Sequence, residues 1–239
     1  MGSDTAMSGT AYGIGVGPGD PELITLKGAR LIGACPVIAY PAPDDGESLA
    51  RAIAAPHIPE GRTEIVIRTP MVAERYPARA VYDAATDDIA GHLAAGRDVA
   101  ILCEGDPFFY GSFMYLFDRL AARAPVSVVP GVTSLTACAA ALAAPLAARN
   151  DVLTIIPATL DAMAIARRLA TCDSAAIIKV GRHLAKVRTV LAESGLAADA
   201  RYVERATMTE QRVRPLAEVG DDAPYFSMIL VHRRGAATA

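Results

Sequence analysis

The segment between residues 99 and 113 combines residue types that can contact a small molecule. An apolar run over Val99–Cys103 ends abruptly in Glu-Gly-Asp-Pro at residues 104–107, and an aromatic-rich helical pattern follows. This order predicts a strand, a tight turn and a helix, and open α/β sheets bind their ligands at the carboxyl ends of such strands. Gly105 allows a ligand to approach the backbone closely, and Asp106 can accept a hydrogen bond from a ligand amine, amide or hydroxyl. The same residue types also form ordinary turns, so the turn alone leaves a purely structural role open.

A second glycine-rich turn stands near the start of the chain. Residues 12–20 read Tyr-Gly-Ile-Gly-Val-Gly-Pro-Gly-Asp, and a helical apolar pattern follows over residues 22–33. The run does not match a dinucleotide-binding fingerprint, because Pro18 or Asp20 stands where the third glycine is required. Acidic residues at the start of a helix cap it and repel a phosphate. The turn therefore suits a neutral or cationic ligand, or close packing.

Together with two later stretches, these turns make the chain similar to a known family. Residues 13–20, 104–111, 129–134 and 204–213 resemble motifs of the tetrapyrrole (class III) S-adenosylmethionine-dependent methyltransferases of cobalamin and sirohaem synthesis. The stretches are spread over residues 13–213, so the similarity covers nearly the whole chain. Within the family, residues 102–117 are most similar to the members that methylate C20 of precorrin-2.

The resemblance implies an α/β fold of two α/β domains with a cofactor cleft between them, and a homodimer. It implies S-adenosyl-L-methionine as methyl donor, no metal, and methyl transfer to C20 of the tetrapyrrole precorrin-2, giving precorrin-3A. The same reaction on cobalt-factor II, or methylation at another position of a precorrin- or uroporphyrinogen-type macrocycle, stays open. Ribosomal RNA or a modified histidine of a translation factor is a more distant substrate. Outside the class, the chain could be a non-catalytic nucleotide-binding or assembly module.

The resemblance also implies which residues contact the cofactor. They are Pro18, Glu104, Gly105, Asp106, Phe109, Thr133, Ser134, Val180, Ala206 and Met208. The residues from 104 to 109 match positions around the amino-acid end of the cofactor, the two hydroxyl residues match the methionine portion, and the last three match the adenosine. Structural alternatives are turn formation for the glycine turns, helix capping for the hydroxyls, and core packing for Phe109 and Met208. Tyr110 is the aromatic residue expected to face the substrate, and no catalytic base is assigned.

Two of these positions depart from the family pattern. Glu104 stands where relatives commonly have a small residue, so the resemblance extends to its backbone and not to its side chain. Ala206 stands where a glycine is frequent, which allows a slightly different backbone there.

Composition and charge argue against several other classes of protein. The chain has 239 residues, 52% of them hydrophobic, and a net charge of −3. It contains no long run of Lys and Arg typical of a nucleic-acid-binding arm, no apolar run long enough to span a membrane, and no signal peptide in residues 1–10. The sequence thus predicts a cytoplasmic protein that binds neither nucleic acid nor membrane.

The cysteines, histidines and arginines differ in what their spacing indicates. The four cysteines and four histidines show no metal-ligand spacing, which predicts reduced, structural thiols and no metal site. Arginines at positions 201, 205, 212 and 214 alternate with glutamates. Such a local set of guanidinium groups can bind carboxylates even in a weakly acidic chain.

Strand-like and helix-like segments alternate, which predicts parallel βαβ units. Predicted strands of the first half are residues 11–16, 37–40, 64–68, 99–103 and 126–129, with helices at 22–33, 48–55, 79–95 and 110–122. Pro130 and Gly131 break the pattern, which predicts a flexible tail (1–10), an N-terminal α/β domain (11–129) and a C-terminal α/β domain (130–239). In the second half, strands are expected at 152–156, 174–180 and 202–204, and helices at 133–144, 161–170 and 183–193. Residues 211–219 and 225–231 are expected as two further, antiparallel strands joined by the turn at 221–224.

Overall fold

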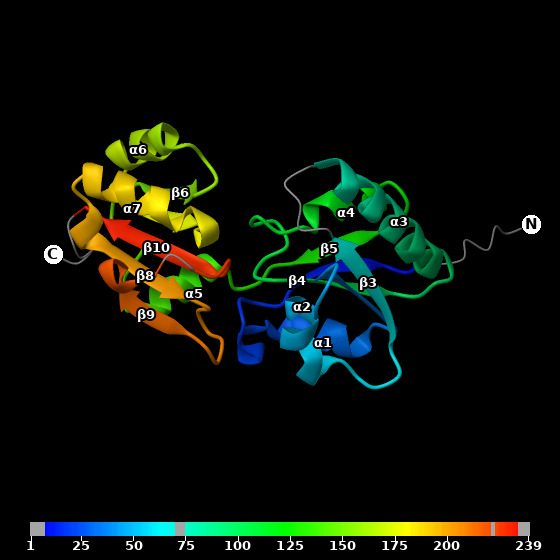
Figure 1. Ribbon diagram of the computed structural model, residues 1–239. Helices are drawn as coiled ribbons and strands as arrows, with labels where there is room; N and C mark the ends of the chain where they lie inside the picture. The colour runs from blue at the N-terminus through cyan, green and yellow to red at the C-terminus, as the bar shows by residue number, and fades with distance from the viewer. Residues whose placement is uncertain (1–7, 70–74, 221–222, 234–239) are drawn as a thin grey trace, which may run out of the picture. The chain divides into compact units, whose positions relative to one another are not determined.

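The computed structural model describes residues 8–69, 75–220 and 223–233 (Figure 1). The chain divides into two compact units, the first ending at Thr133 and the second beginning at Ser134. Each unit contains one five-stranded sheet with helices, so the predicted α/β fold class is confirmed. Most of the predicted tail, residues 1–7, lies outside the described residues.

The sheet of the first unit is entirely parallel, as the alternation of elements predicts. Its strands are β1 (Ala11–Gly15), β2 (Val37–Pro43), β3 (Thr63–Thr69), β4 (Val99–Cys103) and β5 (Val126–Val129), in the order β3-β2-β4-β1-β5. From β1 the chain continues to β2, in one direction across the sheet, and from β4 it continues to β5, in the opposite direction. The neighbours β1 and β4 therefore form a topological switch point, where ligands bind in open α/β sheets.

Helices cover both faces of this sheet (Figure 1). They are α1 (Leu26–Ala34), α2 (Leu49–Ala54), α3 (Arg75–Ala94) and α4 (Met114–Ala121), with short 3-10 turns η1 (Pro21–Leu23) and η2 (Ala55–His57). On one face, Ile14 and Ile38 of the sheet pack with Ile32 and Ile53 of α1 and α2. The other face packs in a separate buried cluster against α3 and α4. Burial on both faces explains why β1, β2 and β4 read as nearly continuous apolar runs.

The first helix begins later than the sequence predicts. A helix is expected from Glu22, whereas α1 starts at Leu26 because two successive caps divide the segment. The Asp20 carboxylate accepts a hydrogen bond from the Glu22 N–H at 2.8 Å and caps the short turn η1. The Thr25 hydroxyl then accepts one from Gly28 N–H at 3.1 Å and caps α1. Asp20 thus acts as a cap, but of η1, whereas α1 is capped by Thr25.

The second unit has a mixed sheet, in the order β6-β7-β10-β8-β9. Its elements are α5 (Ser134–Ala141), β6 (Leu153–Pro157), α6 (Ala162–Ala170), β7 (Ser174–Ile178), η3 (Gly181–His183), α7 (Leu184–Glu193), η4 (Ala197–Asp199), β8 (Ala200–Glu204), β9 (Arg212–Pro215), η5 (Leu216–Glu218) and β10 (Ser227–His232). Leu184 and Leu191 of α7 and Ile165 of α6 pack against Tyr202 and Ile229 of the sheet.

The two predicted tail strands exist, but they do not pair with each other. Both are antiparallel to β8, which lies between them in the sheet. The prediction that they form one antiparallel pair was wrong. A short loop between two strands usually indicates a hairpin, but here β9 pairs with one edge of β8 and β10 pairs with the other. Residues 221–222 of the expected turn lie outside the described residues.

Candidate functional site

The loops that follow β1 and β4 lie against each other at the carboxyl edge of the first sheet. Past the strand ends, the Val16 N–H donates to the Cys103 carbonyl at 2.9 Å. Gly105 N–H then donates to the Gly17 carbonyl at 2.8 Å, and Gly17 N–H donates to the Gly105 carbonyl at 3.3 Å. These two glycines have φ values of 80° and 65°, which glycine adopts without strain. The two glycine turns singled out in the sequence are therefore joined backbone to backbone.

Other glycines of these turns serve close packing. A Cβ on Gly15 would lie 2.5 Å from the Gly105 carbonyl oxygen and 2.6 Å from the Gly131 Cα, and a Cβ on Gly131 would lie 2.1 Å from the same oxygen. A Cβ on Gly13 would lie 2.4 Å from the ring of Phe113. The space beside these three glycines is filled by the protein itself, so the structural alternative holds for them.

The Asp106 carboxylate fixes the loops at this edge. One of its oxygens, Oδ1, accepts a hydrogen bond from the Phe108 N–H at 2.9 Å, and Oδ2 accepts one from the Gly131 N–H at 3.0 Å. Asp106 thus ties the turn after β4 to the loop after β5. Each carboxylate oxygen has two acceptor positions, so a ligand N–H can bind beside these backbone partners. The structure therefore shows directly that Asp106 positions these two loops.

Glu104 is a half-buried carboxyl at the end of β4. Burial raises the pKa of Glu104, while hydrogen bonds from the backbone N–H groups of Ala50 and of Glu104 itself act in the opposite direction. A cation nearby would favour the ionised form and lower the pKa of Glu104. With Asp20 and Asp106, this edge therefore presents acidic side chains and backbone carbonyls, which suit a positively charged ligand group better than a phosphate.

The loop from β4 to α4 exposes aromatic side chains. Tyr110 has a φ of 56°, which is rare for a non-glycine residue, and its ring stands almost perpendicular to that of Phe109 with the centroids 5.2 Å apart. A left-handed residue cannot lie within a helix, so no helix begins at Tyr110 as the sequence predicts, and α4 begins at Met114. Strained residues held by their surroundings cluster at functional sites, and Tyr110 is 48% exposed.

The remaining predicted contacts in and beside the first unit lie on the same loops. Pro18 is buried and directly follows Gly17. Thr133 is half-buried and lies two residues past Gly131, while Ser134 is exposed and begins α5. The structure thus places Pro18 and Thr133 on loops that the glycine contacts bring together.

The predicted contacts of the second unit gather at one edge of its sheet. Val180 follows β7, and Ala206 and Met208 follow β8. Because β7 and β8 both pair antiparallel with β10, they run in the same direction and end at the same edge. Val180 and Ala206 are buried, and Met208 is half-buried. Their backbone groups are accordingly the groups that a ligand at this edge would meet.

The backbone at this edge of the second unit is strained. Lys179, Arg205 and Thr207 have φ values of 58°, 49° and 69°. Left-handed conformations cost free energy for residues with a Cβ and persist where the surroundings impose them. Their concentration after β7 and β8 marks this edge as the candidate functional region of the second unit.

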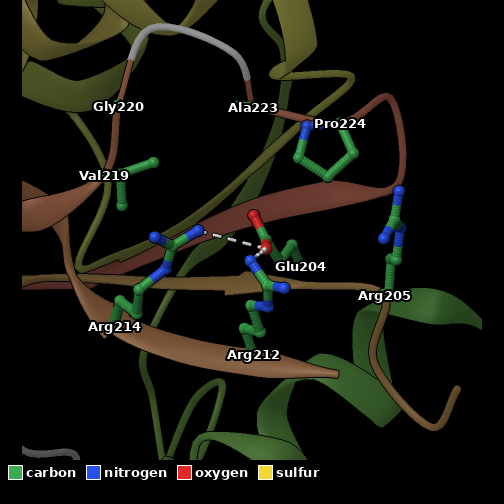
Figure 2. A pocket seen from close by; sticks show the side chains of 8 residues that line it. All are labelled: Glu204, Arg205, Arg212, Arg214, Val219, Gly220, Ala223 and Pro224. Carbon is green, nitrogen blue, oxygen red and sulfur yellow. Dashed lines mark hydrogen bonds and ion pairs between the residues drawn. The ribbon is translucent and has the colours of Figure 1, made fainter. Parts of the chain in front are cut away.

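A cavity opens next to β8 and β9 (Figure 2). Its volume is about 280 Å³, and its lining residues are Glu204, Arg205, Arg212, Arg214, Val219, Gly220, Ala223 and Pro224. We refer to it as the arginine cavity. The sequence revealed the arginine cluster but not the cavity. The signal that could have found it is the spacing of Arg212 and Arg214, which puts both side chains on one face of a strand.

The described residues contain no group of three or more His, Cys, Asp or Glu side chains that could hold a metal ion. All four cysteines are buried and unpaired, as their spacing predicts. Burial raises the pKa of the Cys35 and Cys138 thiols to about 12, which keeps them protonated and unreactive. Among the described helices, none has the length and apolar character needed to cross a bilayer.

Comparisons with known proteins show the family of the chain. The family model described as Tetrapyrrole (Corrin/Porphyrin) Methylases matches residues 10–220. The chain is 46% identical over 232 residues to the cobalamin biosynthesis protein CobIJ of Mycobacterium tuberculosis, a match that covers 93% of this chain and 46% of the relative. The chain therefore spans about half the length of that relative.

Two shorter relatives match over nearly their whole length. The precorrin-2 C(20)-methyltransferase of Sinorhizobium sp is 43% identical, over 93% of this chain and 95% of the relative. The cobalt-precorrin-2 C(20)-methyltransferase of Salmonella typhimurium is 34% identical, over 95% of this chain and 98% of the relative.

Solved structures share the fold. The uroporphyrin-III C-methyl transferase from Thermus thermophilus, complexed with S-adenyl homocysteine, superposes with a TM-score of 0.68 at 22% identity, over 94% of this chain and 92% of that chain. The family model, the relatives and the fold confirm the resemblance seen in the sequence. The chain belongs to the tetrapyrrole (corrin/porphyrin) methylases.

Proposed function

We propose that the chain transfers a methyl group from S-adenosyl-L-methionine to C20 of precorrin-2, giving precorrin-3A in corrin ring synthesis. The observation that carries this proposal is the 43% identity to a precorrin-2 C(20)-methyltransferase across 95% of that relative. The family is dependent on S-adenosylmethionine, and the two sheet edges described above offer residues for it. A homodimer, which the resemblance implies, and a cytoplasmic location, which the sequence predicts, remain predictions.

The acceptor groups at the first sheet edge fit this cofactor. S-adenosylmethionine supplies a methyl group on a cationic sulfur, which is already a good electrophile. Glu104, Asp106 and the carbonyls of the joined glycine turns offer oxygens to its positive groups. The proposed contacts in and beside the first unit are Pro18, Glu104, Gly105, Asp106, Phe109, Thr133 and Ser134, and those of the second unit are Val180, Ala206 and Met208.

The contribution of the protein to this reaction is to bind and orient the methyl donor and the macrocycle. The paired hydrogen bonds between Gly17 and Gly105 fix the loop backbone, and Asp106 adds a third tie to Gly131. Tyr110, held in a strained conformation, is proposed to face the macrocycle. Holding two reactants in line can lower a barrier by roughly 7–11 kcal/mol at best, so the reaction does not require a strong nucleophile from the protein.

The test is methyl transfer from ¹³C-methyl-labelled S-adenosylmethionine to a panel of macrocycles. The panel contains precorrin-2, its cobalt-bearing form and uroporphyrinogen III, and mass spectrometry counts the added methyl groups. We expect one methyl group on precorrin-2, with the label on C20 by NMR. A label on another carbon would overturn the C20 assignment, and preference for the cobalt form would favour the activity named for the Salmonella relative. Cofactor binding without transfer to any macrocycle would favour a non-catalytic module.

A further inference from the structure

The arginine cavity is organised around a buried carboxylate (Figure 2). The Glu204 side chain is 5% exposed. It accepts a hydrogen bond from the Tyr202 hydroxyl at 2.6 Å and one from an Arg214 guanidinium nitrogen at 3.1 Å. Cross-strand register places Glu204 directly opposite Arg212 and Tyr202 opposite Arg214, so all four side chains share one face of the β8–β9 pair. The cavity wall is therefore a fixed part of the sheet.

Glu204 does not balance the positive charge of the cavity. Its oxygen lies 3.9 Å from the nearest Arg212 nitrogen, and the Arg212 side chain is 62% exposed. Within residues 8–69, 75–220 and 223–233, the Arg205 side chain makes no ion pair or hydrogen bond, and the buried Arg214 Nε has no hydrogen-bond partner. Buried N–H donors normally have an acceptor, because leaving one unsatisfied is costly. The lining residues therefore favour a ligand group that is negatively charged and has more than one oxygen.

The position and size of the cavity narrow the choice of ligand. Arg205 is one of the strained residues after β8 and directly precedes the proposed cofactor contact Ala206. A volume of about 280 Å³ lies below the range of about 300–1,000 Å³ that holds whole drug-sized ligands. It admits a substituent but not a macrocycle. Planar guanidinium groups bind carboxylates through paired hydrogen bonds.

We propose that the arginine cavity binds a carboxylate side chain of the tetrapyrrole substrate, with Arg205 and Arg212 as the residues that bind it. This inference rests on the proposed function, because macrocycles of this class carry acetate and propionate side chains. Arg214 is the positioning residue, since its guanidinium is already paired with Glu204. The cavity thereby helps to set which macrocycles the protein accepts and how they are oriented.

The test compares Arg205→Ala, Arg212→Ala and Arg212→Lys with the wild-type protein. The matched control is Arg167→Ala, which removes an exposed arginine from α6 outside the cavity. Initial rates with precorrin-2 give KM and kcat, and calorimetry gives the Kd for S-adenosylhomocysteine, which carries a carboxylate but no macrocycle. Thermal unfolding verifies that each variant is folded, which is expected because Arg214 keeps the Glu204 pair in all of them.

Loss of a hydrogen bond to a charged group corresponds to an increase in KM of about tenfold or more for each alanine variant. We expect this increase with an unchanged Kd for S-adenosylhomocysteine, partial recovery in Arg212→Lys, and wild-type values in Arg167→Ala. Unchanged KM in both alanine variants would overturn the inference but leave the proposed function intact. A weaker Kd for S-adenosylhomocysteine with unchanged KM would assign the cavity to the cofactor instead. Absence of product with wild-type protein would overturn the proposed function and, with it, this inference.

Discussion

Replacing Asp106 by alanine should loosen the candidate site by a measurable amount. The substitution removes the acceptors of two backbone hydrogen bonds, at 2.9 Å to Phe108 and 3.0 Å to Gly131. A hydrogen bond to a charged group contributes about 1.5–3 kcal/mol, and the half-buried position favours the lower value, so the two together are worth about 3 kcal/mol. In a chain of this length such a loss lowers the Tm by roughly 6–12 °C. Affinity for S-adenosylhomocysteine should fall as well, because the loops that Asp106 ties are those proposed to hold the cofactor.

Circular dichroism on heating and isothermal calorimetry measure the two effects separately. Asp106→Asn is the matched variant, because its amide oxygen can still accept one of the two N–H groups while its amide nitrogen cannot accept the other. We expect an intermediate Tm for it. If Asp106→Ala unfolded at the wild-type temperature and lost only ligand affinity, the positioning role would be wrong and a direct contact with the ligand would be the better explanation.

Two further predictions concern the same sheet edge. Gly131→Ala should strongly destabilise the first unit, because its Cβ would lie 2.1 Å from the Gly105 carbonyl oxygen. The control Gly91→Ala adds a Cβ in open space on α3 and should stabilise the unit by about 0.5–1 kcal/mol. Equal Tm values for the two variants would contradict the close packing at Gly131. Glu104→Gln should gain stability relative to wild type as the pH rises above 4.5, because burial raises the pKa of Glu104 in the folded chain and ionisation there opposes folding. Thermal unfolding between pH 4 and pH 8 checks this, and parallel curves for the two proteins would show that the carboxyl is not perturbed.

Local patterns predicted most of the elements. The bounds of β4 and β5 agree with the prediction, and β4 shows why: a buried parallel strand is a continuous apolar run bounded by turn residues. Helix starts were less predictable. Apolar spacing alone does not show that Thr25 caps a helix separate from η1, or that Tyr110 adopts a left-handed conformation. The predicted pairing of β9 with β10 was wrong because β8, a strand distant in sequence from β10, inserts between them.

The candidate site was predictable as a set of turns but not as an arrangement. The sequence pointed to Gly17 and Gly105 separately, whereas their mutual hydrogen bonds depend on β1 and β4 being neighbours. It indicated Asp106 as a ligand acceptor and did not reveal its backbone partners, since Gly131 lies 25 positions away. Likewise, the arginine cluster was visible in the sequence, but the buried Glu204 that organises it depends on strand register.

The reciprocal bonds between Gly17 and Gly105 also provide an internal reporter. The Gly105 N–H can exchange with deuterium only when its 2.8 Å bond to the Gly17 carbonyl opens. Exchange at this single amide therefore measures how often the two turns separate, without any ligand or added label. A compound that binds on these turns would slow that exchange more than one that binds elsewhere in the protein.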